Sequence, residues 1–209
     1  MKLVSLISSG IDSPVATYLL SKKADEIILV HGDIHPFKDD REINNFKKLA
    51  SHLKKIIPCN MKIYLIPHGY NLHSFKQGCN NRFTCVFCKR MLLRYAEKIA
   101  EKHDADAIIM GDSLGQVASQ TLQNISVIDQ AIKIPVLRPL IGFDKEEIVK
   151  IAKNIGTYDL SILPSNGCNA VPNKPATMTK IEKIIEEENK IDINSLLNEA
   201  LEKSILIKI

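Results

Sequence analysis

Short runs of β-branched and other apolar residues alternate along this chain with stretches that have a helical pattern. Five such runs are bounded by turn residues and predict buried strands: Leu3–Ile7, Glu26–His31, Lys62–Ile66, Ala107–Met110 and Pro135–Leu137. Helical patterns lie between them, over residues 14–23, 40–56, 86–102 and 113–123. This alternation predicts an α/β fold with a doubly wound, mainly parallel five-stranded sheet, whose ligands bind at the carboxyl ends of the strands.

The chain beyond the fifth strand has a different pattern. Asp144 is followed three residues later by Glu147, which is the arrangement of a capping box and predicts a helix that ends at Gly156. Residues 163–175 are rich in Pro, Gly and Asn and predict a loop, which contains Cys168.

The end of the chain predicts two amphipathic helices, over residues 178–188 and 192–203. Helices of this kind usually serve packing or dimerisation. We therefore expect an α/β domain over residues 1–176 and a helical extension over residues 177–209, and a homodimer is one arrangement that the extension could support.

Composition excludes several classes of protein. The chain has 209 residues, of which 45% are apolar and 25% charged, the usual balance of a soluble globular protein. No apolar run approaches the roughly 20 residues of a membrane-spanning helix, and the N-terminal run has no cleavage site of a signal peptide. Five cysteines, two of them in a Cys-x-x-Cys pair, fit metal or redox chemistry better than a disulfide framework. We expect a cytoplasmic protein without membrane association.

Charge is distributed unevenly along the chain. The formal net charge is +4, but residues 76–102 hold seven basic residues against two acidic ones, whereas residues 180–209 hold five against seven. The basic excess predicts a local surface for a polyanionic partner, with an ordinary solvated helix face as the alternative. The seven basic residues are Lys76, Arg82, Lys89, Arg90, Arg94, Lys98 and Lys102.

The segment Ser8–Pro14 lies between the first predicted strand and the first predicted helix. Its small residues allow backbone N–H groups to approach a phosphate, its hydroxyls add donors, and the helix N-terminus supplies partial positive charge. The segment lacks the Gly-Lys-Ser/Thr of a Walker loop, so a P-loop NTPase is disfavoured. It therefore predicts an anion-binding loop, with an ordinary strand–helix turn as the alternative.

Four segments resemble known enzymes. Leu6–Ala16 is similar to the pyrophosphatase loop Ser-Gly-Gly-x-Asp-Ser of the ATP pyrophosphatases that adenylate their substrates. Gly111–Leu122 is more specific and resembles the tRNA 4-thiouridine synthetases, also called tRNA sulfurtransferases. Leu137–Gly142 and Ile155–Tyr158 match the same family in order, and the resemblance covers about residues 3–170.

The resemblance implies a fold and an activity. The fold is the α/β fold of the adenine-nucleotide α-hydrolases (HUP-like), followed here by C-terminal helices. The resemblance implies that residues 1–176 are an adenylation and thiolation domain of the ATP pyrophosphatase type. The implied activity is adenylation of a tRNA uridine with release of pyrophosphate, after which sulfur replaces O4 to give 4-thiouridine. Thiolation of another RNA position or of a small metabolite is one alternative, and a non-catalytic nucleotide- and iron–sulfur-binding subunit is another.

The resemblance also implies an ATP site. The end of the first strand would contact the nucleotide through its backbone, and the end of the second strand would hold the adenine. Lys89 would reach the phosphates. Asp12 and Asp112 are candidates to help to organise Mg²⁺, and Asp12 is also assigned as catalytic. The implied ATP-binding residues are Leu6, Ile7, Ser8, Gly10, Asp12, Ser13, His31, Gly32, Lys89, Gly111, Asp112 and Gln120.

Three cysteines form a second candidate site. Cys85 and Cys88 share one turn at a predicted helix N-terminus, which favours thiolate, and Cys168 follows the last motif of the resemblance. The resemblance implies that the three are catalytic and bind a 4Fe–4S cluster with one iron open to sulfide or another sulfur donor. A persulfide or disulfide relay, and a zinc site completed by Cys79, are the alternatives.

Two departures from the resembled family bear on the prediction. Ser9 replaces the first glycine of the loop, which requires a negative φ at that residue. The RNA-binding THUMP domain and the rhodanese domain of the family are not in this sequence, so we expect a stand-alone form that works with a separate THUMP-type RNA-binding protein.

One further cysteine and three histidines are expected to take no part in the chemistry. Cys59 follows Pro58 at a helix end and is expected to serve packing. His68, His73 and His103 have no partner at ligand spacing and are expected to be surface or loop histidines.

Overall fold

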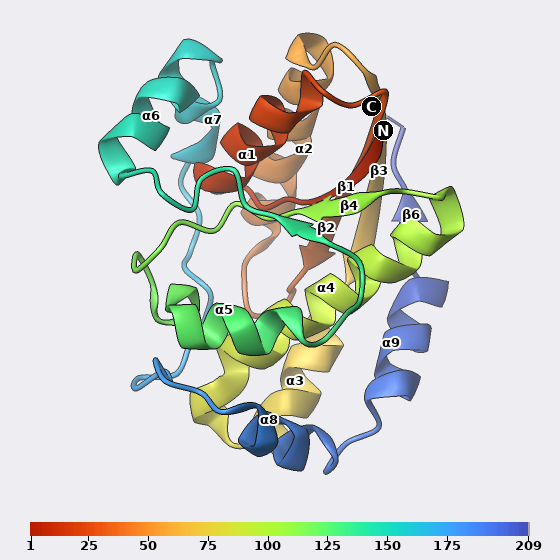
Figure 1. The fold of residues 1–209 in the computed structure, drawn as a ribbon, viewed down its shortest axis with the longest axis vertical. Coiled ribbons are helices and arrows are strands. Elements are labelled where there is room, and N and C mark those ends of the chain that lie inside the picture. The colour runs from red at the N-terminus through yellow and green to blue at the C-terminus, as the bar shows by residue number, and fades with distance from the viewer. Residues whose placement is uncertain (209) are drawn as a thin grey trace.

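A six-stranded sheet forms the middle of the protein in the computed structural model, which describes residues 1–208 (Figure 1). The strand order is β5–β4–β1–β2–β3–β6, and all pairs are parallel except β3 with β6. The predicted doubly wound, mainly parallel sheet is confirmed, with six strands in place of five. The strands are β1 (Lys2–Leu6), β2 (Glu26–Asp33), β3 (Asn60–Pro67), β4 (Ala107–Ile109), β5 (Val136–Leu137) and β6 (Ile205–Leu206).

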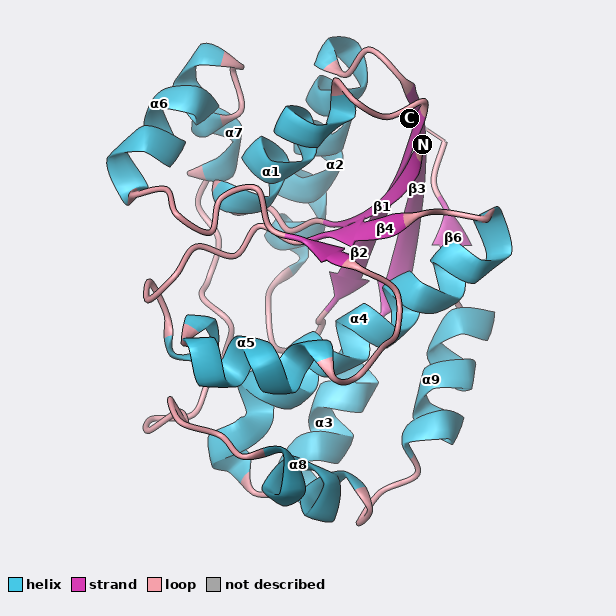
Figure 2. Ribbon diagram, in the orientation of Figure 1, coloured by secondary structure: helices cyan, strands magenta, loops and turns pink. Residues whose placement is uncertain are grey.

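Helices cover both faces of the sheet (Figure 2). One face carries α1 (Asp12–Ser21), α2 (Asp40–Ile56), α6 (Lys145–Asn154) and the single turn α7 (Tyr158–Ser161). The other face carries α3 (Gly69–Gly78), α4 (Thr84–His103), α5 (Leu122–Asp129), α8 (Ile181–Glu188) and α9 (Ile193–Glu202). Among residues 1–208, no helix is long and apolar enough to cross a lipid bilayer.

The sheet is buried on both sides, which explains the continuous apolar runs in the sequence. Along β2, Ile27 and Leu29 join the core beneath α1 and α2, whereas Ile28 and Val30 join the core beneath α3 and α4. Successive side chains of a strand point to opposite faces, so a strand between two helical layers needs apolar residues at every position.

The strand order places a crevice beside β1. The chain moves from β1 to β2 to β3 in one direction, and then crosses to β4 on the other side of β1. The connections after β1 and β4 lead to opposite faces of the sheet, α1 on one and α5 on the other (Figure 1). In open α/β sheets, ligands bind outside the carboxyl ends of strands at such a switch point.

The helix predicted over residues 113–123 is wrong. The chain there is a loop with one 3₁₀ turn, Ala118–Gln120, and α5 begins only at Leu122. The Thr121 hydroxyl accepts a hydrogen bond from the Asn124 N–H at 3.2 Å and caps α5. Leu114 and Val117 are exposed, so the apolar spacing in this segment does not form a buried stripe.

The helix predicted over residues 40–56 is found with these bounds, the remaining predicted helices are found with shifted ends, and the capping box is confirmed. The Asp144 carboxylate accepts from the Glu147 N–H, and the Glu147 carboxylate accepts from the Asp144 N–H, both at 2.9 Å. Gly156 follows α6 with a φ of +72°, a conformation that favours glycine. The sequence-based prediction missed α3, α7 and β6, and α4 begins at Thr84 rather than at residue 86.

The C-terminal segment shares the core of the rest of the chain. Ile184 of α8 and Leu197 of α9 are buried against the same cluster as α3 and α4. Strand β6 pairs antiparallel with the edge of β3, where Ile205 faces Leu65. The division into a catalytic domain over residues 1–176 and an extension over residues 177–209 stays a prediction. In the structure, both parts contribute side chains to one core.

Candidate functional site

The segment Ser8–Ser13 folds into a closed loop at the carboxyl end of β1. The N–H of Ser8 donates to the Ser13 hydroxyl at 2.9 Å, and the N–H of Gly10 donates to the Ser8 hydroxyl at 3.3 Å. Gly111 packs beneath the loop so closely that a Cβ there would lie 2.7 Å from the backbone of Ser13. The loop and the start of the Gly111–Leu122 motif are therefore adjacent, as the doubly wound fold predicts.

Ser9 fits the loop without strain. Asp104 is the only residue other than glycine with a positive φ in the described chain, so Ser9 has the negative φ that a side chain requires. The Ser9 side chain is buried, and its hydroxyl donates to the Glu42 carboxylate at 3.0 Å. The serine at this position thus ties the loop to α2.

A cluster of charges centres on Asp112, which follows Gly111 and so lies one residue from the contact with the loop. Both carboxylate oxygens of Asp112 are bound: Oδ1 accepts from Lys89 Nζ at 2.6 Å, and Oδ2 accepts from Arg138 Nε at 2.9 Å. Burial acts to raise the pKa of Asp112, but the charges and hydrogen bonds of Lys89 and Arg138 outweigh it and lower the pKa. Arg138 also forms two hydrogen bonds to Asp129, which fix its orientation.

Gln120 completes this cluster from the 3₁₀ turn. Its side-chain amide donates to Asp112 at 3.4 Å and is buried. Within residues 1–208, no group donates to its Oε1, which is buried as well. A buried acceptor without a partner is costly in free energy, so this oxygen fits a donor on a ligand.

Asp12 lies at the start of α1 and reaches a residue from far along the chain. Its Oδ1 accepts a hydrogen bond at 2.6 Å from Nζ of Lys145, which is the first residue of α6. Both side chains are partly exposed, so the pair is accessible to a ligand at the mouth of the loop. Lys145 adds a cation that the resemblance did not name.

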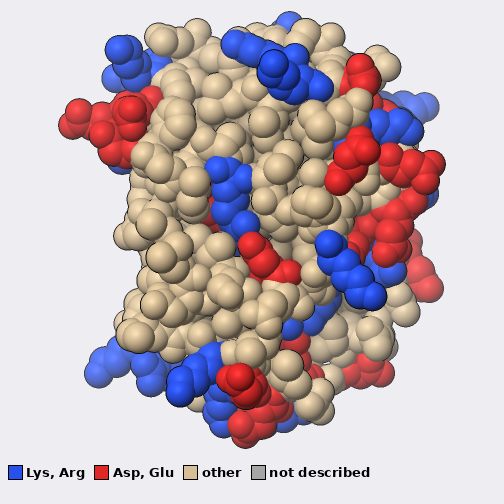
Figure 3. Space-filling model, viewed as in Figure 1, with Lys and Arg blue, Asp and Glu red and all other residues tan. Residues whose placement is uncertain are grey.

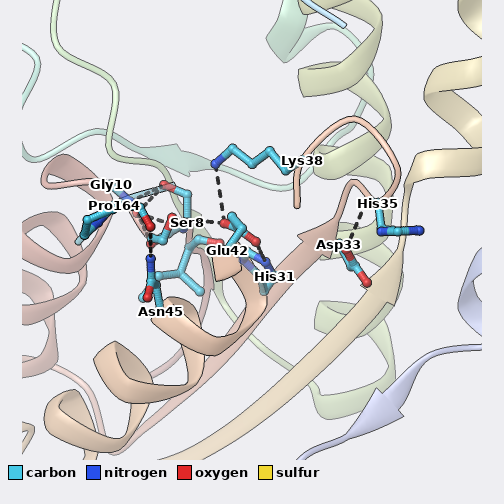
Figure 4. A network of polar contacts seen from close by, with 12 residues as sticks. Ser8, Gly10, His31, Asp33, His35, Lys38, Glu42, Asn45 and Pro164 are labelled. Atoms are coloured by element: carbon cyan, nitrogen blue, oxygen red, sulfur yellow. Dashed lines mark hydrogen bonds and ion pairs between the residues drawn. The ribbon is translucent and has the colours of Figure 1, made fainter. Parts of the chain in front are cut away.

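A buried polar network lies behind the loop (Figure 4). The His31 ring stands between two acceptors, with Nδ1 at 2.9 Å from the Ile7 carbonyl and Nε2 at 3.1 Å from Glu42. Lys38 approaches the same carboxylate at 3.5 Å. Burial acts to raise the pKa of Glu42, but His31, with Lys38 and Ser9, outweighs it and lowers the pKa to about 2.

The contacts limit how the predicted nucleotide residues at the strand ends could act. The His31 side chain is 2% exposed and stacks on Phe46 at 3.9 Å, so it does not face a ligand. The Ile7 N–H donates to the Val30 carbonyl, and its own carbonyl faces His31. The His31 ring therefore supports the loop, and the implied adenine contact of His31 stays a prediction for its backbone.

Two other residues at the strand ends are placed by packing. A Cβ on Gly32 would lie 2.5 Å from the Leu92 side chain, so this glycine allows α4 to pack against the end of β2. Leu6, the last residue of β1, is buried in the core beneath α4. Their backbone contacts to a nucleotide stay predictions.

Cys85, Cys88 and Cys168 are close enough to influence one another. Burial raises the pKa of Cys88 to about 12, and Cys168 and Cys85 add to this effect, whereas Lys89 opposes it. Burial and then Cys168 likewise raise the pKa of Cys85. The prediction that the helix N-terminus and nearby basic residues favour thiolates is wrong for the metal-free protein, because burial dominates.

His68 is not a surface residue, which corrects the sequence-based interpretation. It is fully buried at the start of α3, and burial lowers its pKa to about 3. Its Nε2 lies 3.4 Å from Cys88 Sγ, and its Nδ1 lies 3.1 Å from the Tyr95 hydroxyl. The thiol group, which consists of Cys85, Cys88 and Cys168, therefore has the neutral imidazole of His68 as a direct neighbour at Cys88. His103 is half-buried and forms a hydrogen bond with Tyr64, whereas His73 is exposed as expected.

The other two cysteines stand apart from this group. Cys79 donates to the Glu187 carbonyl at 3.3 Å, and burial and Glu187 raise its pKa to about 11. Cys59 packs against the core beneath α2, as expected. Among residues 1–208, no three His, Cys, Asp or Glu side chains are arranged to hold a metal ion. The described residues therefore show neither the zinc site with Cys79 as a fourth ligand nor a formed site of Cys85, Cys88 and Cys168, and the cluster stays a prediction.

The expected basic surface over residues 76–102 is largely absent. Arg90 and Arg94 both bind the Glu188 carboxylate of α8, each through two hydrogen bonds of 2.8–2.9 Å, and Arg90 is buried. Lys89 is bound to Asp112, and Lys98 to Glu101. On the face shown in Figure 3, basic and acidic side chains are interspersed. The sequence gives no sign of these pairs because the acid partners of the arginines lie about 95 residues away.

Sequence reasoning missed four residues of the site. Arg138 and Lys145 lie in or next to matching segments and could have been found there, as cations next to strand and helix ends. Glu42 and His68 are different, since a single acid on a helix face and a single histidine after a strand carry no local signal.

The strand order, the loop between β1 and α1 and the charges around Asp112 define an α/β nucleotide-binding protein of the pyrophosphatase-loop class. Comparison with known families is more specific. Residues 1–193 match the family described as thiamine biosynthesis protein (ThiI), and the chain belongs to this family.

Named relatives agree with the family. The chain is 42% identical over 203 residues to a probable tRNA sulfurtransferase of Methanothermobacter thermautotrophicus, covering 97% of this chain and 52% of that protein. It is 40% identical over 209 residues to a probable tRNA sulfurtransferase of Methanosarcina mazei, covering 100% and 52%. The chain thus spans about half the length of the curated relatives that it matches.

Solved structures support the same fold. A 4-thiouridine synthetase, in complex with RNA and with bound ATP, superimposes with a TM-score of 0.93 at 34% identity, covering 99% of this chain and 55% of that one. NMN synthetase from Francisella tularensis superimposes with a TM-score of 0.55 at 14% identity, covering 96% and 84%, which supports the fold alone.

Proposed function

We propose that this chain carries out ATP-dependent sulfur transfer to tRNA, in which O4 of a uridine is adenylated and then replaced by sulfur to give 4-thiouridine. The observation that carries the proposal is the placement of Cys88 and Lys89 on α4. Lys89 binds Asp112 beside the anion-binding loop, while Cys88 contacts His68 near two other thiols. Activation and sulfur chemistry thus meet on one helical turn. The ATP- and RNA-bound relative supports the same substrates.

In the adenylation step, uridine O4 attacks the α-phosphate of ATP and pyrophosphate leaves. The loop from Ser8 to Ser13 supplies hydroxyls and a helix N-terminus for the phosphates, as P–O charge develops. Lys89 and Lys145 are the cations on its two sides. Asp112 positions Lys89, and Asp12 positions Lys145. Oε1 of Gln120 is the free acceptor for a donor of the nucleotide.

Magnesium fits this site as a companion of ATP rather than as an ion with its own protein cage. Asp112 already binds two cationic side chains, and Asp12 binds one. Mg²⁺ usually keeps several waters and is held by substrate phosphates with one or two carboxylates. Asp12, which is partly exposed, is the carboxylate that could turn from Lys145 to the ion.

In the sulfur step, sulfur displaces AMP from C4 of the activated uridine. Cys85, Cys88 and Cys168 are the residues that would hold a 4Fe–4S cluster; in the described residues they lie near one another but are not arranged to hold a metal ion, so their side chains would have to converge on it. Such a cluster, when bound, supplies an iron without a protein ligand, where sulfide can be held. Because burial raises the pKa of the free thiols, binding of a metal is also what would convert them to thiolates.

We propose that most of the affinity for tRNA comes from outside residues 76–102. Arg90, Arg94 and Lys89 are engaged with carboxylates, which leaves few cations of this segment for phosphates. A THUMP-type RNA-binding region or a second copy of the chain would supply the remaining contacts.

The test is anaerobic incubation of the protein with tRNA, ATP, Mg²⁺ and sulfide, followed by mass spectrometry of the tRNA nucleosides and measurement of AMP. We expect 4-thiouridine and tRNA-dependent AMP. Asp12→Ala should lose both products, whereas Cys168→Ala should retain AMP formation and lose the thionucleoside. AMP formation that does not depend on tRNA would contradict the proposed substrate.

A further inference from the structure

A chain of buried hydrogen bonds connects α9 with the thiol group. Its residues lie outside the proposed adenylation site. It runs from the Leu196 carbonyl to Asn71, then to the Tyr95 hydroxyl, then to His68 and finally to Cys88. Asn71, Tyr95 and His68 are each no more than 2% exposed. The four side chains come from α3, from its N-terminus and from α4, and the carbonyl comes from the C-terminal helix.

The direction of this chain is fixed at its α9 end. A backbone carbonyl can only accept, so the group of Asn71 that faces Leu196 at 3.1 Å must be the amide nitrogen. The same nitrogen faces the Tyr95 oxygen, which must then accept from it. The hydroxyl has one proton of its own, and His68 Nδ1 is the acceptor within reach.

The opposite direction leaves a buried proton without a partner. If His68 Nδ1 carried the proton and donated to Tyr95, the hydroxyl oxygen would accept two hydrogen bonds. Its own proton would then have no acceptor among the contacts of residues 1–208. A buried polar group without a partner costs the free energy of its lost hydration, so this arrangement is disfavoured.

We propose that His68 is a positioning residue for the Cys88 sulfur: Tyr95 holds its neutral ring in the tautomer with the proton on Nε2, and this N–H donates to Sγ. A sulfur that accepts this hydrogen bond is oriented by it, and its negative charge, whether as free or as metal-bound thiolate, is stabilised. The role of this contact in sulfur transfer rests on the proposed function, whereas the tautomer does not.

The first test reads the tautomer directly. In the full chain labelled with ¹⁵N-histidine, long-range ¹H–¹⁵N spectra distinguish the protonated from the unprotonated ring nitrogen, and His68→Gln identifies the signals. We expect Nε2 to carry the proton. Asn71→Asp offers Tyr95 a carboxylate acceptor and should move the proton to Nδ1. Tyr64→Phe removes a hydroxyl from the separate Tyr64–His103 pair and should leave the His68 signals unchanged.

The second test reads the sulfur. Alkylation of Cys88 in the metal-free protein at one fixed pH, followed by peptide mass spectrometry, should slow about tenfold in His68→Phe, the effect of one lost hydrogen bond to a charged acceptor. His68→Gln keeps an N–H donor and should restore most of the rate, with thermal melting to establish that each variant is folded.

Either test can overturn the proposal without ATP or tRNA, so its failure is separate from failure of the proposed function. A wild-type ring protonated at Nδ1 would exclude the tautomer, and this is read from the wild-type spectrum, with His68→Gln used only to assign its signals. Alkylation at the wild-type rate in His68→Phe, or an equal loss in His68→Gln and His68→Phe, would show that the N–H does not act on the sulfur.

Discussion

Asp112 and Glu42 beside the loop are buried and the thiols Cys85 and Cys88 of α4 are half-buried, yet removal from water has opposite outcomes for their charge. Asp112 and Glu42 each have cationic or histidine partners, which outweigh burial and lower their pKa values. Cys85 and Cys88 have one another, Cys168 and one opposing lysine, so burial prevails and their pKa values rise.

This difference indicates which site is complete without a cofactor. The carboxylate cluster already holds Lys89 and Arg138 in place, so charge is organised there before a ligand arrives. Lys89, the cation that opposes burial at the thiols, is already bound to Asp112, and Arg90 and Arg94, which follow it in α4, are bound to Glu188. A bound metal centre would supply the missing positive charge at the thiols.

The largest expected effect concerns the charged side. Lys89→Ala should lower the rate of AMP formation by about 100- to 1,000-fold, because a positioned cation or donor at a developing charge contributes that much. AMP release in the presence of tRNA measures it. Lys98→Ala is the matched control, since Lys98 lies on the same helix but binds Glu101 at the surface. A Lys89→Ala protein with normal turnover would remove Lys89 from the site.

The next effect is on stability and depends on pH. The folded pKa of Glu42, about 2, lies below its ordinary value of 4.5, so its ionised form stabilises the fold. The shift corresponds to about 3 kcal/mol. This contribution is fully present above about pH 4.5 and is lost as the pH falls toward about 2. The difference in unfolding free energy between wild type and Glu42→Gln should therefore shrink across this interval, as measured by urea unfolding.

The matched control for Glu42 is Glu101→Gln, which removes an exposed carboxylate paired with Lys98. Exposed pairs contribute about 0–1 kcal/mol, so this variant should differ little from wild type at any pH. A difference for Glu42→Gln that stays constant down to about pH 3 would contradict the charged network, since an ionised Glu42 is what the pH removes.

A smaller effect concerns the two thiols of the pair. In metal-free protein near neutral pH, Cys85 should be alkylated faster than Cys88, because the thiolate is the reactive form and burial raises the pKa of Cys88 further. Peptide mass spectrometry over a time course measures both rates. Anaerobic loading with iron and sulfide should protect both cysteines, and faster labelling of Cys88 would reverse the comparison drawn here.

The smallest effect extends the same pairing argument to RNA binding. Of the seven basic residues in 76–102, four are bound to carboxylates, namely Lys89, Arg90, Arg94 and Lys98. Each phosphate that a protein neutralises changes the slope of log K against log salt by about 0.9 in duplex nucleic acid. Lys102→Ala should thus lower the slope for tRNA by at most about 1, whereas Arg94→Gln should leave it unchanged. Filter binding over a salt series measures both.

Much of the fold could be predicted because the strands have a strong local signal. The runs at residues 3–7 and 26–31 are apolar at nearly every position, which a strand between two helical layers requires. The segment 113–123 has apolar residues at a helical spacing, but Leu114 and Val117 point to solvent in a loop. Strand β6 has two exposed residues, and only its pairing with β3 makes it a strand.

The candidate site could be predicted only where a motif marks it. The loop Ser8–Ser13 and Gly111 are adjacent as expected, since the order of β-strands brings both to one edge. The contact between Asp12 and Lys145 spans 133 residues, and the contact between Asn71 and Leu196 spans 125. Such pairs depend on how helices pack in space, which no local pattern in a single sequence encodes.

The position of Cys88 directly before Lys89 has a consequence for the reactive adenylate. Consecutive Cα atoms are about 3.8 Å apart, and the two side chains leave α4 toward the thiols and toward Asp112. Under the proposed function, a base activated beside Lys89 can receive sulfur without dissociating and without a swinging carrier arm. The lifetime of the adenylate in contact with water is then set by local motion of the RNA, which favours thiolation over wasteful hydrolysis.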